Sequence, residues 1–139
     1  MNRVIISDFK DIGKVLNIIH DQYFEKEDIK FNAKSQTLEI KFERLMYEKA
    51  KIVKNLLLIR KYQCPVVEFI LKINFVETYQ VKARESFGMF NTIRYDAEKK
   101  LIVIVSDIPI TIKIRVTKFH IEVVDTGKIL GTKTYWTPW

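Results

Sequence analysis

The stretch Ile108-Pro109-Ile110-Thr111-Ile112-Lys113-Ile114-Arg115-Val116 decides the fold. Its even positions are all apolar, whereas positions 111, 113 and 115 are polar or charged. Successive side chains of a β-strand point to opposite faces, so this alternation predicts a strand with one buried and one solvated face. From Phe119 to Val123 the apolar positions become odd, and this shift predicts a β-bulge near Thr117 and Lys118.

The same two-residue period predicts further strands on the N-terminal side of this stretch. Residues 28–43 are expected to form a hairpin with one solvated face, and residues 69–75 a single strand. Residues 90–105 are expected to form a second hairpin. Because residues 101–105 are apolar on both faces, that strand is expected at the centre of a sheet.

Three other segments have a less regular pattern. Residues 45–63 fit either a short helix or a strand, a choice that stays open for 51–62, and Pro65 is expected to end the segment. Asp125-Thr126-Gly127-Lys128 is typical of a turn between strands. The chain finishes in an aromatic tail, residues 135–139.

Residues 8–23 have the spacing of an amphipathic helix. Phe9, Ile12, Leu16 and Ile19 follow one another at intervals of three and four, and Asp8 is a suitable N-cap. The predicted fold class is therefore α+β, with an N-terminal helix packed on a curved, mainly antiparallel β-sheet or partial barrel. Residues 1–139 are expected to form a single globular domain, a usual size for one.

The charge is uneven along the chain, which carries a formal net charge of +7. Residues 1–48 have 8 basic and 9 acidic side chains, whereas residues 49–139 have 16 basic and 8 acidic ones. A basic part attracts polyanions such as nucleic acid, although it also simply keeps a protein in solution.

Cys64 is the only cysteine, so no internal disulfide forms and a reducing compartment is expected. The longest apolar run, residues 101–105, is far shorter than the ~20 residues that a membrane-spanning helix needs. We therefore expect a cytoplasmic protein with no membrane partner. With only His20 and His120 beside Cys64, neither a zinc site nor another cofactor is expected.

Six cations are candidates for a nucleic-acid interface. Lys72, Lys113 and Arg115 lie on the polar sides of predicted strands, and three more lie near strands in the sequence: Lys82, Arg84 and Lys118. A basic sheet face with interspersed tyrosines binds single strands by charge and stacking. The alternative is a solvated face whose charges prevent edge pairing.

The aromatic tail is a candidate partner-binding segment through Tyr135, Trp136 and Trp139. Exposed, these side chains would form an interaction site, because Trp and Tyr dominate interface hot spots. Buried, they would belong to a last strand that ties down the terminus. Burial is the favoured prediction, with a homodimer as one way to achieve it.

Two motifs suggest hydrolase chemistry. Asp125-Thr126-Gly127 is similar to the active-site triplet of aspartic proteases, but Lys128 stands where that family has a small residue. His20-Asp21 is a pair that acts as a base or metal ligand in some enzymes. For both, a structural role is the favoured interpretation.

One further pattern resembles a known group. Residues 19–21, Ile-His-Asp, are followed by Ile-Lys-Phe at 29–31 and Leu-Glu-Ile at 38–40. This resembles an uncharacterised prokaryotic family of small α+β domains and, more loosely, some immunity proteins of bacterial toxin systems. The resemblance implies a helix that leads into a β-meander, but no activity and no residue roles.

The sequence therefore predicts a small non-enzymatic binding or interaction protein, with a homodimer as one possible form. The alternative is a nucleic-acid-binding protein that uses a basic β-sheet face. A hydrolase around Asp125 or His20-Asp21 is the remote alternative.

Overall fold

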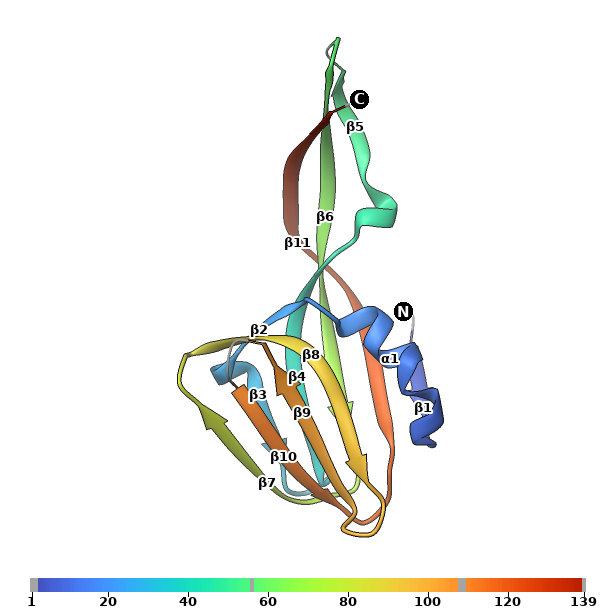
Figure 1. The fold of residues 1–139 in the computed structure, drawn as a ribbon, viewed down its shortest axis with the longest axis vertical. Helices are drawn as coiled ribbons and strands as arrows, with labels where there is room; N and C mark the ends of the chain where they lie inside the picture. The colour runs from blue at the N-terminus through green and yellow to red at the C-terminus, as the bar shows by residue number, and fades with distance from the viewer. Residues whose placement is uncertain (1–2, 56, 108–109, 139) are drawn as a thin grey trace.

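The structure is a computed structural model that describes residues 3–55, 57–107 and 110–138. It contains two antiparallel sheets that curl around a shared core (Figure 1). The first sheet has the order β1 (Arg3–Ile6), β11 (Ile121–Pro138), β6 (Ile59–Ile73), β4 (Thr37–Leu45) and β3 (Ile29–Asn32), with β5 (Lys51–Asn55) also paired to β6. The second sheet has the order β2 (Tyr23–Glu25), β8 (Phe87–Asp96), β9 (Leu101–Ser106), β10 (Ile110–Val116) and β7 (Val76–Ala83).

The predicted alternation places the core between the sheets. In β10 the apolar residues Ile110, Ile112, Ile114 and Val116 are buried. Strand β9 lies between β8 and β10, which confirms its predicted central position. Ile108 lies outside the described residues.

The fold consists mainly of antiparallel strands with one short helix, α1 (Ile12–Ile19). The helix is shorter than the predicted residues 8–23, because Asp8 caps a separate 3-10 turn by accepting a hydrogen bond from Lys10 N. At the other end, His20 leaves the helical conformation with ψ 133°. Tyr23, the last residue of the predicted helix, instead begins β2, which pairs with β8.

Helix α1 inserts its apolar side into the core. Val15 and Ile19 are fully buried, and the helix contacts β8 of one sheet and β1 and β11 of the other. It therefore lies across one open side between the sheets (Figure 1) instead of covering the face of one sheet.

The choice between helix and strand, left open for residues 51–62, resolves as strand, because Lys51–Asn55 form β5 and Ile59 begins β6, while Leu56 lies outside the described residues. Of the described residues between 45 and 63, only Tyr47–Lys49 form a 3-10 helix. Pro65 does not end the segment, contrary to prediction. Strand β4 pairs with β6 as far as Leu45 and Val66, and β5 pairs with β6 only from Lys51 and Gln63 onward. Pro65 lies between the residues of β6 that pair with β4 and those that pair with β5. A backbone N–H is not needed for strand pairing at this position, so proline is tolerated there.

Two predicted irregularities have a different form in the structure. The shift of apolar positions near Thr117 is not a bulge within one strand, because the chain leaves β10 there and enters β11 in the other sheet. Conversely, the predicted turn at Asp125–Lys128 is a bulge within β11, between the β6-paired residues Asp125 and Ile129. Gly127 adopts φ +76°, a left-handed conformation that glycine accommodates without strain.

Candidate functional site

The most distinctive feature is an arm that projects from the body of the protein (Figure 1). We define the arm as residues 47–65 and 128–138, which comprise a 3-10 turn, β5 and the outer parts of β6 and β11. Because β6 and β11 both continue from the core into the arm, with a bulge in β11 at the arm's base, the two parts share one sheet. The C-terminal end of β11 lies near the tip of the arm.

Nearly all of the net charge is on the arm. Residues 47–65 carry five basic side chains and one acidic one, and residues 128–138 carry two basic side chains and none that is acidic. The arm therefore has a net charge of +6, which leaves +1 for the rest of the chain. The comparison of residues 1–48 with 49–139 did not reveal this concentration of charge, because two segments that are far apart in the sequence build the arm.

The arm also exposes most of the large apolar surface. Of the fourteen large hydrophobic side chains that are exposed in the described residues, nine belong to the arm: Tyr47, Ile52, Val53, Leu57, Leu58, Ile59, Ile129, Leu130 and Trp136. Leu57 and Leu58 at the tip are 88% and 71% exposed. Such a concentration of exposed apolar side chains is typical of a surface that binds a partner.

One face of the arm combines cations with Trp136. Directly opposed residues share a face, and the pairing places Lys54, Lys61 and Trp136 in one row across the three strands. Lys61 Nζ lies 5.6 Å from the centre of the Trp136 ring. The two lysines face each other directly, a like-charge pair that destabilises a sheet unless an anion lies between them.

The other face carries an aromatic cluster. The rings of Tyr62 and Tyr135 are stacked with centres 5.3 Å apart, and Tyr47 meets Tyr135 edge to face. The tail forms the predicted last strand, since β11 pairs with β6, but within one chain it is not buried as expected: Tyr135 is half-buried and Trp136 is 50% exposed. Burial in a homodimer stays a prediction. Trp139 lies outside the described residues.

Cys64 is buried at the base of this aromatic face. Burial raises the pKa of its thiol, and the nearby Glu48 carboxylate adds to this effect. As predicted, this cysteine therefore behaves as a small apolar side chain.

A pocket of about 480 Å³ lies at the base of the arm. Its lining includes the aromatic side chains of Phe24, Phe42 and Phe87. Four carboxylates line it too, from β2, β4, β6 and the turn before β3: Glu25, Asp28, Glu43 and Glu68. They outnumber the two lysines of the lining, Lys41 and Lys128.

The carboxylates of the pocket repel one another. Lys41 Nζ lies 3.9 Å from a carboxylate oxygen of both Asp28 and Glu68 and partly offsets this repulsion. Glu43 directly faces Glu68 across β4 and β6. The pKa of Glu25 is raised, chiefly by a hydrogen bond with Glu27 and by the charge of that residue. The rim is therefore negative and favours a cation.

The bulge of β11 forms one wall of the arm's base. The Asp125 carboxylate accepts a hydrogen bond from Gly127 N at 2.8 Å, and Thr126 Oγ1 donates to Glu68. Asp125, one of the predicted hydrolase residues, thus stabilises the backbone of the bulge. His20 Nδ1 lies 3.2 Å from Asp21 Oδ2 in an exposed pair.

The structure brings together three of the six cationic side chains that were predicted to bind nucleic acid. Lys113 and Arg115 of β10 and Lys82 of β7 are exposed on the outer face of the second sheet. Arg94 of β8, which the sequence did not single out, lies on the same face, in the row of Val103 and Lys113. Arg84 lies in the exposed turn after β7.

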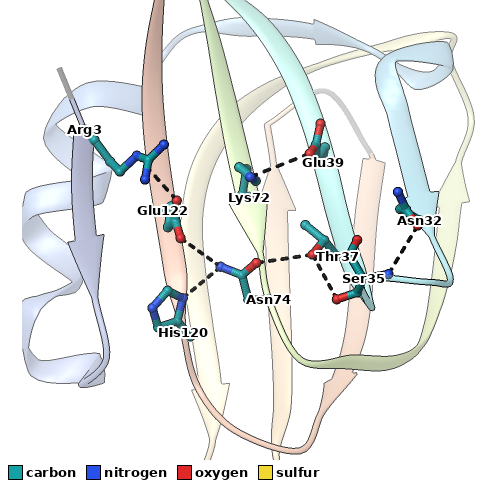
Figure 2. Close-up of polar contacts among 9 residues, drawn as sticks. All are labelled: Arg3, Asn32, Ser35, Thr37, Glu39, Lys72, Asn74, His120 and Glu122. Carbon is teal, nitrogen blue, oxygen red and sulfur yellow. Dashed lines mark hydrogen bonds and ion pairs between the residues drawn. The ribbon is translucent and has the colours of Figure 1, made fainter. Parts of the chain in front are cut away.

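The other two predicted ligands lie elsewhere. Lys72 is on the outer face of the first sheet, where its Nζ lies 3.9 Å from Glu39 (Figure 2). A neutral network of Arg3, Glu122 and Asn74 crosses the same face. Lys118 lies between β10 and β11, with its Nζ 5.4 Å from the centre of the Phe75 ring. No single face therefore carries all six cations.

Within the described residues, no group of three or more His, Cys, Asp and Glu side chains has the arrangement of a metal site. No helix in that part of the chain is long and apolar enough to cross a membrane. No family model, curated protein or solved structure matches the chain. The resemblance to a small prokaryotic family stays a prediction.

Proposed function

We propose that this protein is a non-enzymatic interaction protein that binds its partner through the arm. One observation supports this most strongly: the arm combines a net charge of +6 with nine of the fourteen large hydrophobic side chains that are exposed in the described part of the chain. A folded protein gains nothing in stability from apolar side chains at the end of a narrow projection, so their place there favours a role in binding. A cytoplasmic location fits the single reduced, buried Cys64.

The edges of the arm add a second reason. In the described structure β1 pairs only with residues 121–124 of β11, so the edge of β11 from Ile129 to Pro138 has no neighbouring strand on that side. An unpaired edge offers backbone N–H and C=O groups to a partner. Trp136 beside it supplies the type of side chain that dominates binding energy.

A photo-crosslinking amino acid at the tip tests this proposal. With p-benzoylphenylalanine in place of Leu58, irradiation of intact cells is expected to give a discrete covalent product, because the 71% exposed side chain meets the partner. The same amino acid in place of Lys99, in the exposed turn between β8 and β9, is the control and should give none. Absence of a product from Leu58, or equal products from both positions, would contradict the proposal.

Nucleic-acid binding is the second candidate function, and the outer face of the second sheet supports it. Lys82, Arg94, Lys113 and Arg115 gather there around the central strand β9. These four cations would contact phosphates, with affinity that falls as salt rises.

This second candidate function is tested by measuring the affinity for a labelled single-stranded nucleic acid of 20 nucleotides at 50 and 200 mM salt. Three or four phosphate contacts predict a loss of affinity of roughly 20- to 50-fold between these salt concentrations. Arg115→Gln should weaken binding at low salt by roughly five- to tenfold. Lys72→Gln, which removes the same charge from the other sheet, should leave it unchanged. Equal effects of the two variants would exclude this face as the binding surface.

A further inference from the structure

We propose that two copies of this chain exchange arms, so that the tip of each arm occupies the acidic pocket at the base of the other arm. This inference rests on the proposed function, because it identifies the partner of the arm as a second copy. It accounts for two features together, the basic apolar tip and the acidic aromatic pocket.

The chemistry of the tip matches that of the pocket. Leu57 and Leu58 are apolar and strongly exposed, and the accessible side chains of Tyr23, Phe87 and Leu130 in the pocket lining offer them an apolar surface. Removal of these two leucines from water would therefore favour the contact.

The cations on either side of the tip match the carboxylates of the rim. Lys54 and Lys61 form a like-charge pair across β5 and β6, and Glu43 and Glu68 form a like-charge pair across β4 and β6. Each pair weakens its own sheet in an isolated chain, although Lys41 partly offsets the repulsion at Glu68. When the two pairs meet, both repulsions are offset, which gives the contact its specificity.

One chain cannot make this contact alone. The tip and the pocket lie at opposite ends of the same arm, and residues 59–65 of β6 extend over about 23 Å at ~3.3 Å per residue. Strands β6 and β11 both continue from the core into the arm, with the bulge of β11 at its base, and the arm extends away from that base (Figure 1). The tip of a second copy can bind in the pocket, whereas the tip of the same chain cannot reach it.

The same arrangement explains why the assembly would close at two chains. Two arms related by a two-fold axis run antiparallel, so each tip arrives at the base of the other arm. The contact then occurs twice with the same residues, as in an isologous dimer, and no open end remains to recruit a third chain.

Two charge-reversal variants, one in the arm and one in the pocket, test this proposal. The measurement is the mass of the assembly in solution. The arm variant is Lys54→Glu with Lys61→Glu, and the pocket variant is Glu25→Lys with Glu43→Lys. We expect sedimentation to give the mass of two chains for the unmodified protein and of one chain for either variant. An equimolar mixture of the two variants should recover the mass of two chains, because both exchanged contacts regain opposite charges.

Folding and total charge need a control in this experiment. Lys34→Glu with Lys99→Glu makes the same change in net charge as the arm variant, but at two exposed turns, and should leave the two-chain mass unchanged. Circular dichroism of each variant verifies its fold. The arm variant keeps a like-charge pair across the same strands, so its folding should not differ from that of the unmodified chain.

Other outcomes separate this inference from the proposed function. A one-chain mass for the unmodified protein, or a mixture that stays at one chain, would overturn arm exchange. If the crosslinker at Leu58 still gives a product of another mass, or if anionic vesicles or RNA bind through the arm, the arm remains the binding surface and only its partner changes. Failure of both experiments would overturn the inference and the proposed function together.

Discussion

Phe90→Ala is expected to reduce the free energy of unfolding by about 3–5 kcal/mol. The ring is fully buried, stacks on Phe24 of β2 with centres 4.3 Å apart and meets Phe42 of β4 edge to face at 5.4 Å. It thus joins the two sheets, and alanine leaves a cavity between them. Urea unfolding followed by circular dichroism at one fixed protein concentration measures the change.

Two comparisons make this prediction specific. Phe90→Leu retains most of the buried volume and should cost much less than alanine. Phe87→Ala, in the same strand but at a 40% exposed position, should cost less still. A loss under 1 kcal/mol for Phe90→Ala would contradict the proposed contact between the sheets.

Gly88→Ala is expected to cost about 1–3 kcal/mol, although it adds one methyl group. A Cβ atom at this position would lie 2.7 Å from Ser106 Oγ and 3.0 Å from the Phe24 ring. Ser106 Oγ accepts a hydrogen bond from Met89 N at 2.7 Å, so the hydroxyl cannot move away without losing that bond. Thermal or urea unfolding measures the loss.

A double-mutant cycle with Ser106→Ala gives the decisive control. Removal of the hydroxyl frees space for the new methyl group, so Gly88→Ala should cost less in that background. Gly13→Ala, where a Cβ meets nothing within 4 Å and α1 favours alanine, should instead stabilise by up to about 1 kcal/mol. Equal costs for Gly88→Ala in both backgrounds would show that the clash with Ser106 is not the cause.

The body of the fold could be predicted because its strands have one buried and one exposed face. Alternation at Ile110–Val116 and the doubly apolar pattern at 101–105 gave the right strands and the central place of β9. The helix was predicted too long, because the apolar spacing continues to Tyr23 although the chain turns at His20 to pair β2 with β8.

The arm could not be predicted by the same signal. Every residue of β5 is exposed, so Lys51–Asn55 has no buried face to produce a two-residue period. The pocket draws Glu25, Glu43 and Glu68 from three strands that are far apart in the sequence. Likewise, the polar sides of β6 and β10 look alike in sequence, but Lys72 and Arg115 belong to different sheets. A cluster of cations around the apolar residues 56–59 was the available signal.

The pairing of β1 with β11 has a consequence for the order of events during synthesis. Residues 3–6 find their neighbours only when residues 121–124 have been made, since β1 pairs with no other strand in the described structure. At ~5–20 residues per second, this N-terminal strand waits roughly 6–24 s on the ribosome. Until then the core side of Ile6 remains uncovered, so β1 joins its sheet late, after the strands between residues 23 and 116 have been made.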